Sequence, residues 1–350
     1  MNRQDILERL IAAPLDELLA EADAVRAASV GNGVYLRGIV EFSNRCVRNC
    51  LYCGLRRANT NITRYRMTPD EVVAAALRTA ALGVGTVVLQ SGDDLEYGAE
   101  SIADIIVRIK DQAEIKITLS LGERPFPDYE LWRDVGADRY LMKHETADAD
   151  LYDRLHPGKH LQERLAALRY LKELGYEIGS GFIVGLPGQT ARTLADDIAL
   201  VRELGVDMCG AGPFLPQADT PLSTAARGDE DTTLRVLALL RLACPRANLP
   251  ATTALASLDP GRGQLLALQA GCNVIMPNFT PSAHREHYRI YDHKEAVGLK
   301  SAQAVIRQAG RTLIRDGGLK KPCAIRQKDF ACTSASSDAA TWASPRLSTP

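Results

Sequence analysis

The chain has 350 residues, of which 46% are hydrophobic and 24% charged, and its formal net charge is -1. This near-neutral balance argues against nucleic acid or an anionic membrane surface as a partner, because either would favour a strong basic excess. No apolar stretch reaches the roughly 18 residues of a membrane span, and the start of the chain lacks the apolar core of a signal peptide. We therefore expect a globular cytoplasmic protein, long enough for one barrel or two ordinary domains.

The spacing of apolar residues predicts the first secondary-structure elements. Residues 6–28 predict two short amphipathic helices broken near Pro14, which would form a helical cap over residues 1–30 and cover the bottom of the following domain. Residues 34–42 alternate and are β-branched, which predicts a strand. The segment Thr68–Glu71 has an N-cap threonine, a proline at the first helical position and a capping-box glutamate, and therefore predicts a helix start.

Strands and helices alternate from that helix onward. With the first strand there are about eight β/α units, which is the pattern of a parallel barrel. We therefore expect an α/β fold, a parallel (β/α)8 TIM-type barrel with an N-terminal helical cap and a C-terminal extension; an open doubly wound sheet is the alternative. Further strands are expected at 86–90, 115–121, 139–143, 176–184, 206–212, 251–254 and 273–276, and helices at 102–109, 129–135, 161–174, 194–204, 233–243 and 264–270.

The barrel domain is expected to cover residues 31–291. A helical extension over 292–322 would follow, and the Ser/Ala/Pro-rich tail over 323–350 is expected to be disordered.

Three cysteines, Cys46, Cys50 and Cys53, lie within eight residues directly after the first strand. Soft thiolates favour zinc, copper(I) or iron–sulfur clusters, and three of them leave one corner of a four-iron cluster open to a substrate or cofactor. The alternatives are a zinc loop that borrows a distant fourth ligand, or three incidental cysteines. The other cysteines (Cys209, Cys244, Cys272, Cys323 and Cys332) are scattered, which argues against a disulfide framework and for a reducing compartment.

Polar residues follow several strands, where the mouth of a barrel would lie. Gln90–Asp94 follows the second strand, and Thr118 lies on the third. On the fourth strand, alternation places Arg139, Lys143 and Glu145 on one side. Because buried charge is costly unless it is paired or used, this side suggests a polar ligand or, alternatively, a structural ion-pair layer. Further candidates for the mouth are Arg164, Thr252, Thr253, Met276, Tyr288 and Tyr291.

The Cys-x3-Cys-x2-Cys run, with Tyr52 before its last cysteine, resembles the signature of radical S-adenosylmethionine (SAM) enzymes. Longer strings resemble the HydE family of [FeFe]-hydrogenase maturases within that superfamily, over about residues 31–291. They include Cys50-Leu-Tyr-Cys-Gly-Leu-Arg-Arg57, Thr118-Leu-Ser-Leu-Gly-Glu123, Val184-Gly-Leu-Pro-Gly-Gln-Thr190 and Asn273-Val-Ile-Met-Pro-Asn278.

The resemblance implies that a [4Fe-4S] cluster held by the three cysteines cleaves SAM reductively to a 5′-deoxyadenosyl radical. It further implies a role in assembling the diiron dithiolate centre of the hydrogenase, on a cysteine–iron complex with CO and CN ligands, alongside the maturases HydG and HydF and a low-potential electron donor. By matching position, the SAM contacts would be Tyr52, Gln90, Ser91, Glu145 and Arg164, and the substrate cavity would be lined by Thr118, Arg139, Thr252, Thr253, Met276, Tyr288 and Tyr291.

One departure from the family concerns a second, accessory cluster, which some members hold through three further cysteines. Residues 292–311 contain no cysteine here, so we expect one cluster. Among rivals, a biotin synthase-like enzyme would need cysteines on the second and third strands, which carry none. A methylornithine synthase-like enzyme acting on a small amino acid stays open, as does a non-catalytic iron–sulfur carrier or scaffold.

Overall fold

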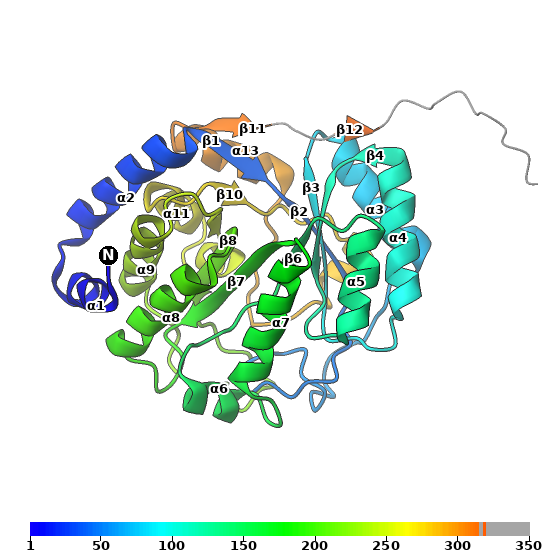
Figure 1. Cartoon of the computed structure of the whole chain (residues 1–350), viewed down its shortest axis with the longest axis horizontal. Coiled ribbons are helices and arrows are strands. Elements are labelled where there is room, and N and C mark those ends of the chain that lie inside the picture. The colour runs from blue at the N-terminus through cyan, green and yellow to red at the C-terminus, as the bar shows by residue number, and fades with distance from the viewer. Residues whose placement is uncertain (315–317, 320–350) are drawn as a thin grey trace, which may run out of the picture. The chain divides into compact units, whose positions relative to one another are not determined.

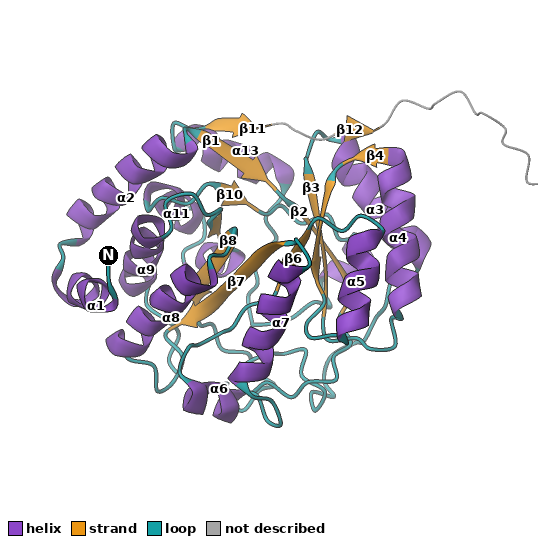
Figure 2. Ribbon diagram, in the orientation of Figure 1, coloured by secondary structure: helices purple, strands orange, loops and turns teal. Residues whose placement is uncertain are grey.

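A parallel β-barrel forms the centre of the computed structural model, which describes residues 1–314 and 318–319 (Figures 1 and 2). The described strands are β1 (Gly33–Leu36), β2 (Gly38–Ser43), β3 (Thr86–Ser91), β4 (Ala113–Glu114), β5 (Lys116–Ser120), β6 (Arg139–Leu141), β7 (Glu177–Val184), β8 (Met208–Pro213), β9 (Pro250–Ala251), β10 (Val274–Ile275), β11 (Thr312–Ile314) and β12 (Gly318–Leu319). Of these, β4 and β12 form a separate antiparallel pair outside the barrel, and β11 lies at the end of its sheet beside β1. One parallel sheet has the order β2-β3-β5-β6-β7-β8 and another the order β11-β1-β10-β9.

Backbone hydrogen bonds join these two sheets into a closed ring. On one side, the Cys209 amide of β8 donates to the Asn248 carbonyl beside β9, at 3.0 Å. On the other side, Ile39 of β2 donates to Pro277 at 2.9 Å and accepts from Phe279 at 2.8 Å, both just beyond β10. Closure removes the free sheet edges and confirms the predicted (β/α)8 barrel.

Helices surround the barrel, and several have the end signals that the sequence predicted. Thr68 accepts from the Glu71 amide and receives the reciprocal glutamate contact, with Pro69 at the first helical position. The helices are α1 (Arg3–Ala12), α2 (Leu15–Val30), α3 (Pro69–Ala81), α4 (Ala99–Gln112), α5 (Phe126–Asp134), α6 (Ala149–Leu155), α7 (Leu161–Glu173), α8 (Ala191–Leu204), α9 (Glu230–Ala243), α10 (Thr253–Leu258), α11 (Gly263–Gln269), α12 (Ser282–Arg285) and α13 (Leu299–Gln308).

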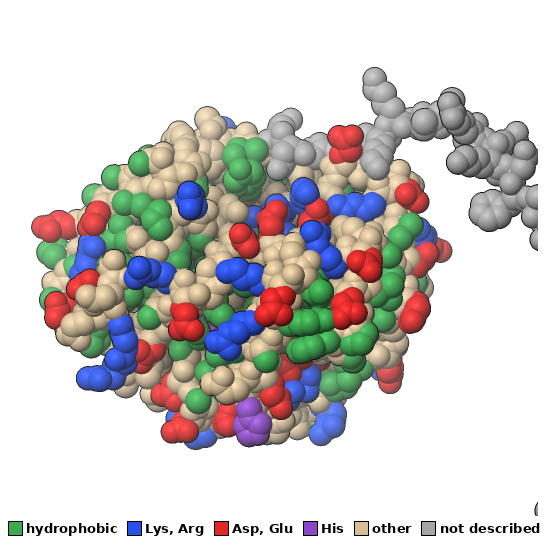
Figure 3. Space-filling view, viewed as in Figure 1, with side chains coloured by type: hydrophobic (Ala, Val, Ile, Leu, Met, Phe, Trp, Pro, Cys, Tyr) green, Lys and Arg blue, Asp and Glu red, His purple; other side chains and the backbone are tan. Residues whose placement is uncertain are grey.

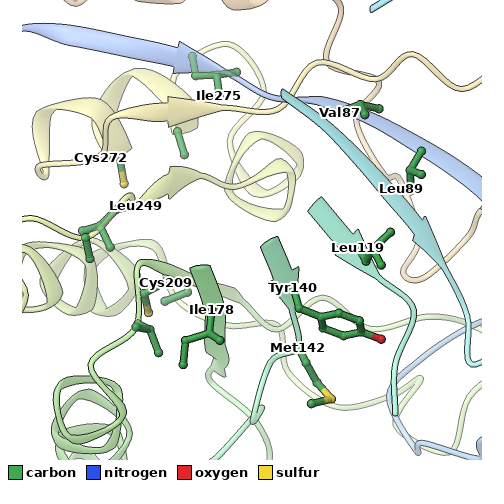
Figure 4. Packing of buried hydrophobic residues seen from close by; sticks show 14 of the residues in the cluster. Val87, Leu89, Leu119, Tyr140, Met142, Ile178, Cys209, Leu249, Cys272 and Ile275 are labelled. Carbon is green, nitrogen blue, oxygen red and sulfur yellow. The ribbon is translucent and has the colours of Figure 1, made fainter. Parts of the chain in front are cut away.

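The core lies between the strands and these helices. Apolar residues on successive strands, such as Leu89 on β3, Leu119 on β5, Tyr140 on β6 and Ile178 on β7, are fully buried and belong to one cluster (Figure 4).

The two N-terminal helices are found, but their position differs from the prediction. They pack mainly on the outer helices α8 and α9 rather than under the barrel (Figure 1). Arg3 of α1 pairs with Asp196 of α8, and Arg235 of α9 donates to the Ala13 carbonyl between α1 and α2. The cap therefore covers a flank of the barrel.

The expected first strand is two strands broken at Arg37, because its halves have different neighbours. β1 lies between β10 and β11, whereas β2 pairs with β3 from Gly38 onward. The expected seventh strand is also shorter: it ends at Ala251, since Thr252 caps α10 by accepting from the Leu255 amide.

After the barrel, the expected helical extension contains α13 but also two unforeseen strands. β11 extends the sheet beside β1, and β12 pairs antiparallel with β4. The expected disorder over 323–350, and with it Cys323 and Cys332, lies outside the described residues.

On the face seen in Figure 3, acidic and basic side chains are interspersed among apolar ones. Within the described residues, no helix is both long enough and apolar enough to cross a bilayer.

Candidate active site

A cavity of about 420 Å³ opens at the carboxyl ends of the barrel strands. Loops after almost every strand contribute to it, as expected for a barrel of this kind. Of the predicted site residues, those that line it are Cys46, Cys50, Tyr52, Cys53, Gln90, Ser91, Thr118, Glu145, Arg164, Thr252, Thr253, Met276, Tyr288 and Tyr291.

The cysteines lie on an irregular loop after β2, and neighbouring segments hold this loop by its backbone. The Val47 amide donates to the Asp93 carbonyl at 3.0 Å, and Leu51 donates to Leu155 at 2.9 Å. A side chain at Gly92 would place its Cβ 2.3 Å from the Arg45 carbonyl oxygen, so the end of β3 approaches the loop closely only because glycine stands there.

Burial controls the protonation of the three thiols. It raises the pKa of Cys46, of Cys50 and of Cys53, the last to about 12, and nearby thiols or Asp93 raise these values further. Thiolates at these positions therefore need a positive metal centre to stabilise them. These are the only cysteines among the described residues that line the cavity, so the donor set fits a cluster bound through three thiolates with one side facing the cavity.

Arg48, between the first two cysteines, ties the loop to the neighbouring strand ends. Its Nε lies 2.6 Å from Asp93 Oδ2 and its terminal nitrogen 3.3 Å from Glu123 Oε2. The Asp93 carboxylate in turn occupies the space of a missing side chain: a Cβ at Gly122, where φ is +72°, would lie 1.6 Å from Asp93 Oδ1. The Asp93 carboxylate therefore holds the cysteine loop in place, and it fits there only because residue 122 is a glycine.

Tyr52 is fixed by His156. The His156 Nδ1 lies 2.8 Å from the Tyr152 carbonyl oxygen, which can only accept, so Nδ1 carries the proton. Nε2 then accepts from the Tyr52 hydroxyl at 2.8 Å. Burial lowers the pKa of His156, which favours this neutral form.

Two charged residues predicted near SAM have protein partners. Glu145 has a φ of +66°, which is strained for a residue with a side chain. Burial would raise its pKa, but Lys143, 3.0 Å from Oε2, lowers it overall, so Glu145 is a carboxylate. Arg164 Nε lies 2.7 Å from Glu123 Oε1 and its terminal nitrogen donates to the Lys143 carbonyl, also at 2.7 Å.

The inner wall is polar. Thr118 Oγ1 is buried and has no hydrogen-bond partner among the described residues, although its side chain faces the cavity. Gln90 Nε2 donates to the Tyr288 hydroxyl at 3.1 Å, which joins a predicted SAM contact to a predicted substrate contact. A buried hydroxyl without a partner is costly, so this wall is suited to a polar ligand.

Arg139 is the predicted site residue that the structure places elsewhere. It does not line the cavity; it lies at the first position of β6, beside the residues that begin β3 and β7. There its Nε pairs with Glu177 at 2.5 Å and its terminal nitrogen donates to Thr86 at 2.9 Å. The alternating pattern predicted which side of the strand Arg139 lies on, but not its position along the strand. Arg139 belongs to a structural ion pair.

Other cavity residues were not assigned from the sequence. Glu41 on β2 is buried and pairs with Lys294, which lies beyond the expected end of the barrel domain. A carboxylate inside a β-branched strand was an available signal for Glu41, whereas Lys294 had none. His156 was missed because α6, which precedes it, was not predicted.

The arrangement of cavity, cluster loop and strand ends agrees with comparisons to known proteins. The sequence pattern of the radical SAM superfamily matches residues 40–201. The fold and the site define a radical SAM enzyme. The "[FeFe] hydrogenase maturase subunit HydE" of Thermotoga maritima is 47% identical over 312 residues, covering 87% of this chain and 89% of that protein. The chain therefore belongs to the HydE family of [FeFe]-hydrogenase maturases.

More distant relatives share the architecture. A 3-methylornithine synthase of Methanosarcina acetivorans is 28% identical over 280 residues, which cover 79% of each chain. The crystal structure of methylornithine synthase (PylB) matches with a TM-score of 0.80 at 26% identity, covering 90% of this chain and 94% of that one.

Proposed function

We propose that this radical SAM enzyme acts in assembly of the diiron dithiolate centre of [FeFe]-hydrogenase, on a small cysteine-derived iron complex that carries CO and CN ligands. The observation that carries the proposal is one shared cavity: the cysteine loop lines the same space as a polar inner wall, whose Thr118 hydroxyl has no hydrogen-bond partner in the described part of the chain. A radical formed at the loop would need to travel only across this cavity to reach a substrate at the wall.

The proposed chemistry divides the cavity into two parts. When bound, the [4Fe-4S] cluster supplies the electron that cleaves SAM to a 5′-deoxyadenosyl radical. Cys46, Cys50 and Cys53 would hold it. The SAM-facing groups would be Tyr52, Gln90, Ser91, Glu145 and Arg164. Substrate would contact Thr118, Thr252, Thr253, Met276, Tyr288 and Tyr291.

The charged and polar groups of the cavity support its division into a SAM part and a substrate part. Glu145 is a carboxylate that can accept from the SAM amino group, and the Arg164 guanidinium is oriented by Glu123. Thr118 Oγ1, which has no partner within the described ranges, can donate to or accept from a substrate group.

We further propose one cluster per chain, HydG and HydF as co-acting maturases, a low-potential electron donor, and a cytoplasmic location. The 47% identity to HydE supports the pathway, and buried free thiols suit a reducing compartment. Reconstituted protein should hold about four irons per chain; a much higher content would contradict the single cluster.

A spectroscopic test addresses the cofactor. Electron paramagnetic resonance of the reduced, anaerobic protein should change when SAM is added, and 5′-deoxyadenosine should form. Cys46→Ala should lose the signal and the iron. Cys244→Ala is the matched control, since Cys244 is half-buried and does not line the cavity. A SAM-independent signal without deoxyadenosine would favour a carrier.

A second test addresses the substrate. Reduced enzyme is incubated with SAM and either a cysteine-bound iron carbonyl cyanide complex or lysine, and deoxyadenosine formation is timed. We expect acceleration by the iron complex. Acceleration by lysine alone would instead indicate a methylornithine synthase-type mutase.

A further inference from the structure

The segment Tyr288–Val297, between α12 and α13, lies along the mouth of the barrel and lines the cavity; we call it the strap. Four of its backbone hydrogen bonds reach other parts of the fold. Ile290 accepts from Gly54 of the cysteine loop at 3.0 Å, and Asp292 donates to Pro216 after β8 at 3.2 Å. Farther on, the Glu295 amide donates to Ser257 of α10 at 2.8 Å and the Val297 carbonyl accepts from Asn278 at 2.8 Å. The strap therefore bonds to elements that follow four neighbouring strands of the ring, β8, β9, β10 and β2.

The cysteine loop is shaped to receive the strap. A Cβ at Gly54, the residue after Cys53, would lie 2.0 Å from the Arg289 carbonyl oxygen. Strap residues also form part of the cavity wall: Tyr288, Ile290, Tyr291, Lys294, Glu295 and Val297.

One side chain connects the strap to the inside of β2. Lys294 pairs with Oε1 of Glu41 on β2, and its Nζ lies 4.8 Å from the centre of the Tyr288 ring. The Lys294 and Glu41 side chains are only 14% and 1% exposed. Glu41 Oε2 accepts from Asn278 at 2.9 Å, so the carboxylate is satisfied only when both partners are in place.

The backbone around Lys294 is arranged to point it inward. His293, the preceding residue, has a φ of +54°, and only it and Glu145 combine a side chain with a positive φ among the described residues. His293 is exposed while Lys294 faces the cavity. Strain of this kind persists where the surrounding contacts outweigh it.

We propose that Lys294 is a positioning residue: its ion pair with Glu41 holds the strap against β2 at the cavity, keeps Tyr288 and Tyr291 in place and excludes water during turnover. A buried pair of this kind is strongly destabilising to break, because one charge is left uncompensated. The effect on turnover rests on the proposed function, whereas the effect on the strap does not.

The test uses the full-length, cluster-loaded protein without substrate. In Lys294→Met, amide hydrogen exchange of residues 288–297 should be about tenfold faster or more, while β3 and β7 exchange as before. Lys294→Arg should restore most of the protection. Lys300→Met is the matched control, because Lys300 is an exposed lysine on α13.

With substrate, Lys294→Met should form more deoxyadenosine per substrate consumed, because the radical is quenched in an open cavity. Unchanged exchange in the strap would overturn the proposal; unchanged exchange with a raised KM would instead assign Lys294 to the substrate. If Lys294→Met does not fold, Glu41→Gln decides by the same exchange measurement, since it keeps the contact with Asn278. If the iron complex is not a substrate, the proposed function is contradicted, but the hydrogen-exchange result for the strap still stands.

Discussion

The Asp93 carboxylate lies 2.6 Å from Arg48 Nε and fills the space that a side chain at Gly122 would occupy. Arg48 stands between two of the predicted cluster ligands, and Glu123, next to Gly122, contacts both Arg48 and Arg164. The cysteine loop and the predicted SAM-facing arginine are therefore held by the same turn after β5, so a change at that turn should reach both.

Gly122→Ala tests this link. The added Cβ would collide with Asp93 at 1.6 Å, at a φ of +72° that costs an L-residue about 1 kcal/mol or more. We expect the free energy of unfolding to fall by roughly 2–4 kcal/mol and iron content after reconstitution to drop. Urea unfolding and iron analysis measure the two effects.

Gly98→Ala is the control for this change. Gly98 precedes α4 with a φ of -60°, and no atom lies within 4 Å of its would-be Cβ. Its variant should lose no more than about 1 kcal/mol, the cost of alanine in place of glycine at the N-cap of α4. Equal losses in both variants would show that the Asp93 contact does not hold the loop.

His156 should make stability depend on pH. Its pKa is lowered in the folded protein, whereas in the unfolded chain it titrates near 6.5. Below that value the unfolded state binds the extra proton first, so stability falls as the pH drops from about 6.5 toward the folded pKa. Only as the pH falls through the folded pKa does Nε2 in the folded protein take a proton and lose its bond from Tyr52.

Urea unfolding at pH 7.5 and pH 5.5 checks this expectation. The loss between the two pH values should be smaller in His156→Gln, which cannot titrate. His160→Gln is the control, because the exposed His160 has its pKa raised by Asp153 and should not reduce the acid-side loss. A wild-type loss equal to that of His156→Gln would contradict the prediction.

Thr118→Val should separate folding from function. It removes a buried hydroxyl that has no partner among the described residues while keeping the shape of the side chain. Stability should stay the same or rise by about 1 kcal/mol, because no hydrogen bond is lost. The KM for the substrate should increase if this hydroxyl contacts it. A clear loss of stability would show that Thr118 has a structural partner instead.

Arg139→Met should give the opposite result. It breaks the pair with Glu177 and leaves the buried Thr86 hydroxyl without its donor, at a cost of about 1–2 kcal/mol. Thermal unfolding should detect the loss, while the KM values for SAM and substrate should not change. A raised KM with unchanged stability would instead show that Arg139 contributes to the cavity.

Local signals in the sequence predicted most of the barrel. Strong caps and periodic apolar residues, as at Thr68–Glu71 and in β7, act over a few residues and leave a clear pattern. The cysteine loop was found for the same reason, since its three ligands are close in the sequence. Thr253 shows the limit: it was assigned to a strand, but the cap at Thr252 starts α10 there.

Long-range relationships were not predictable in this way. Lys294 meets Glu41 across 253 residues, and no local pattern indicates that pair. A two-residue period also does not show how far along a strand a residue lies. It placed Arg139 and Glu145 on the same side but did not show that they lie at opposite ends. The contact between Gly122 and Asp93 can be found only in the structure, because the sequence does not show that a carboxylate fills the space left by the missing Cβ.

The split first strand has a practical consequence for shortened versions of the protein. β1 borders β10 on one side and β11 on the other, and β11 belongs to a segment beyond the barrel. Cutting the chain before Thr312 would bare a row of unpaired amides and carbonyls along β1, which invites self-association and precipitation. Truncations intended for crystallisation should therefore be made beyond Ile314.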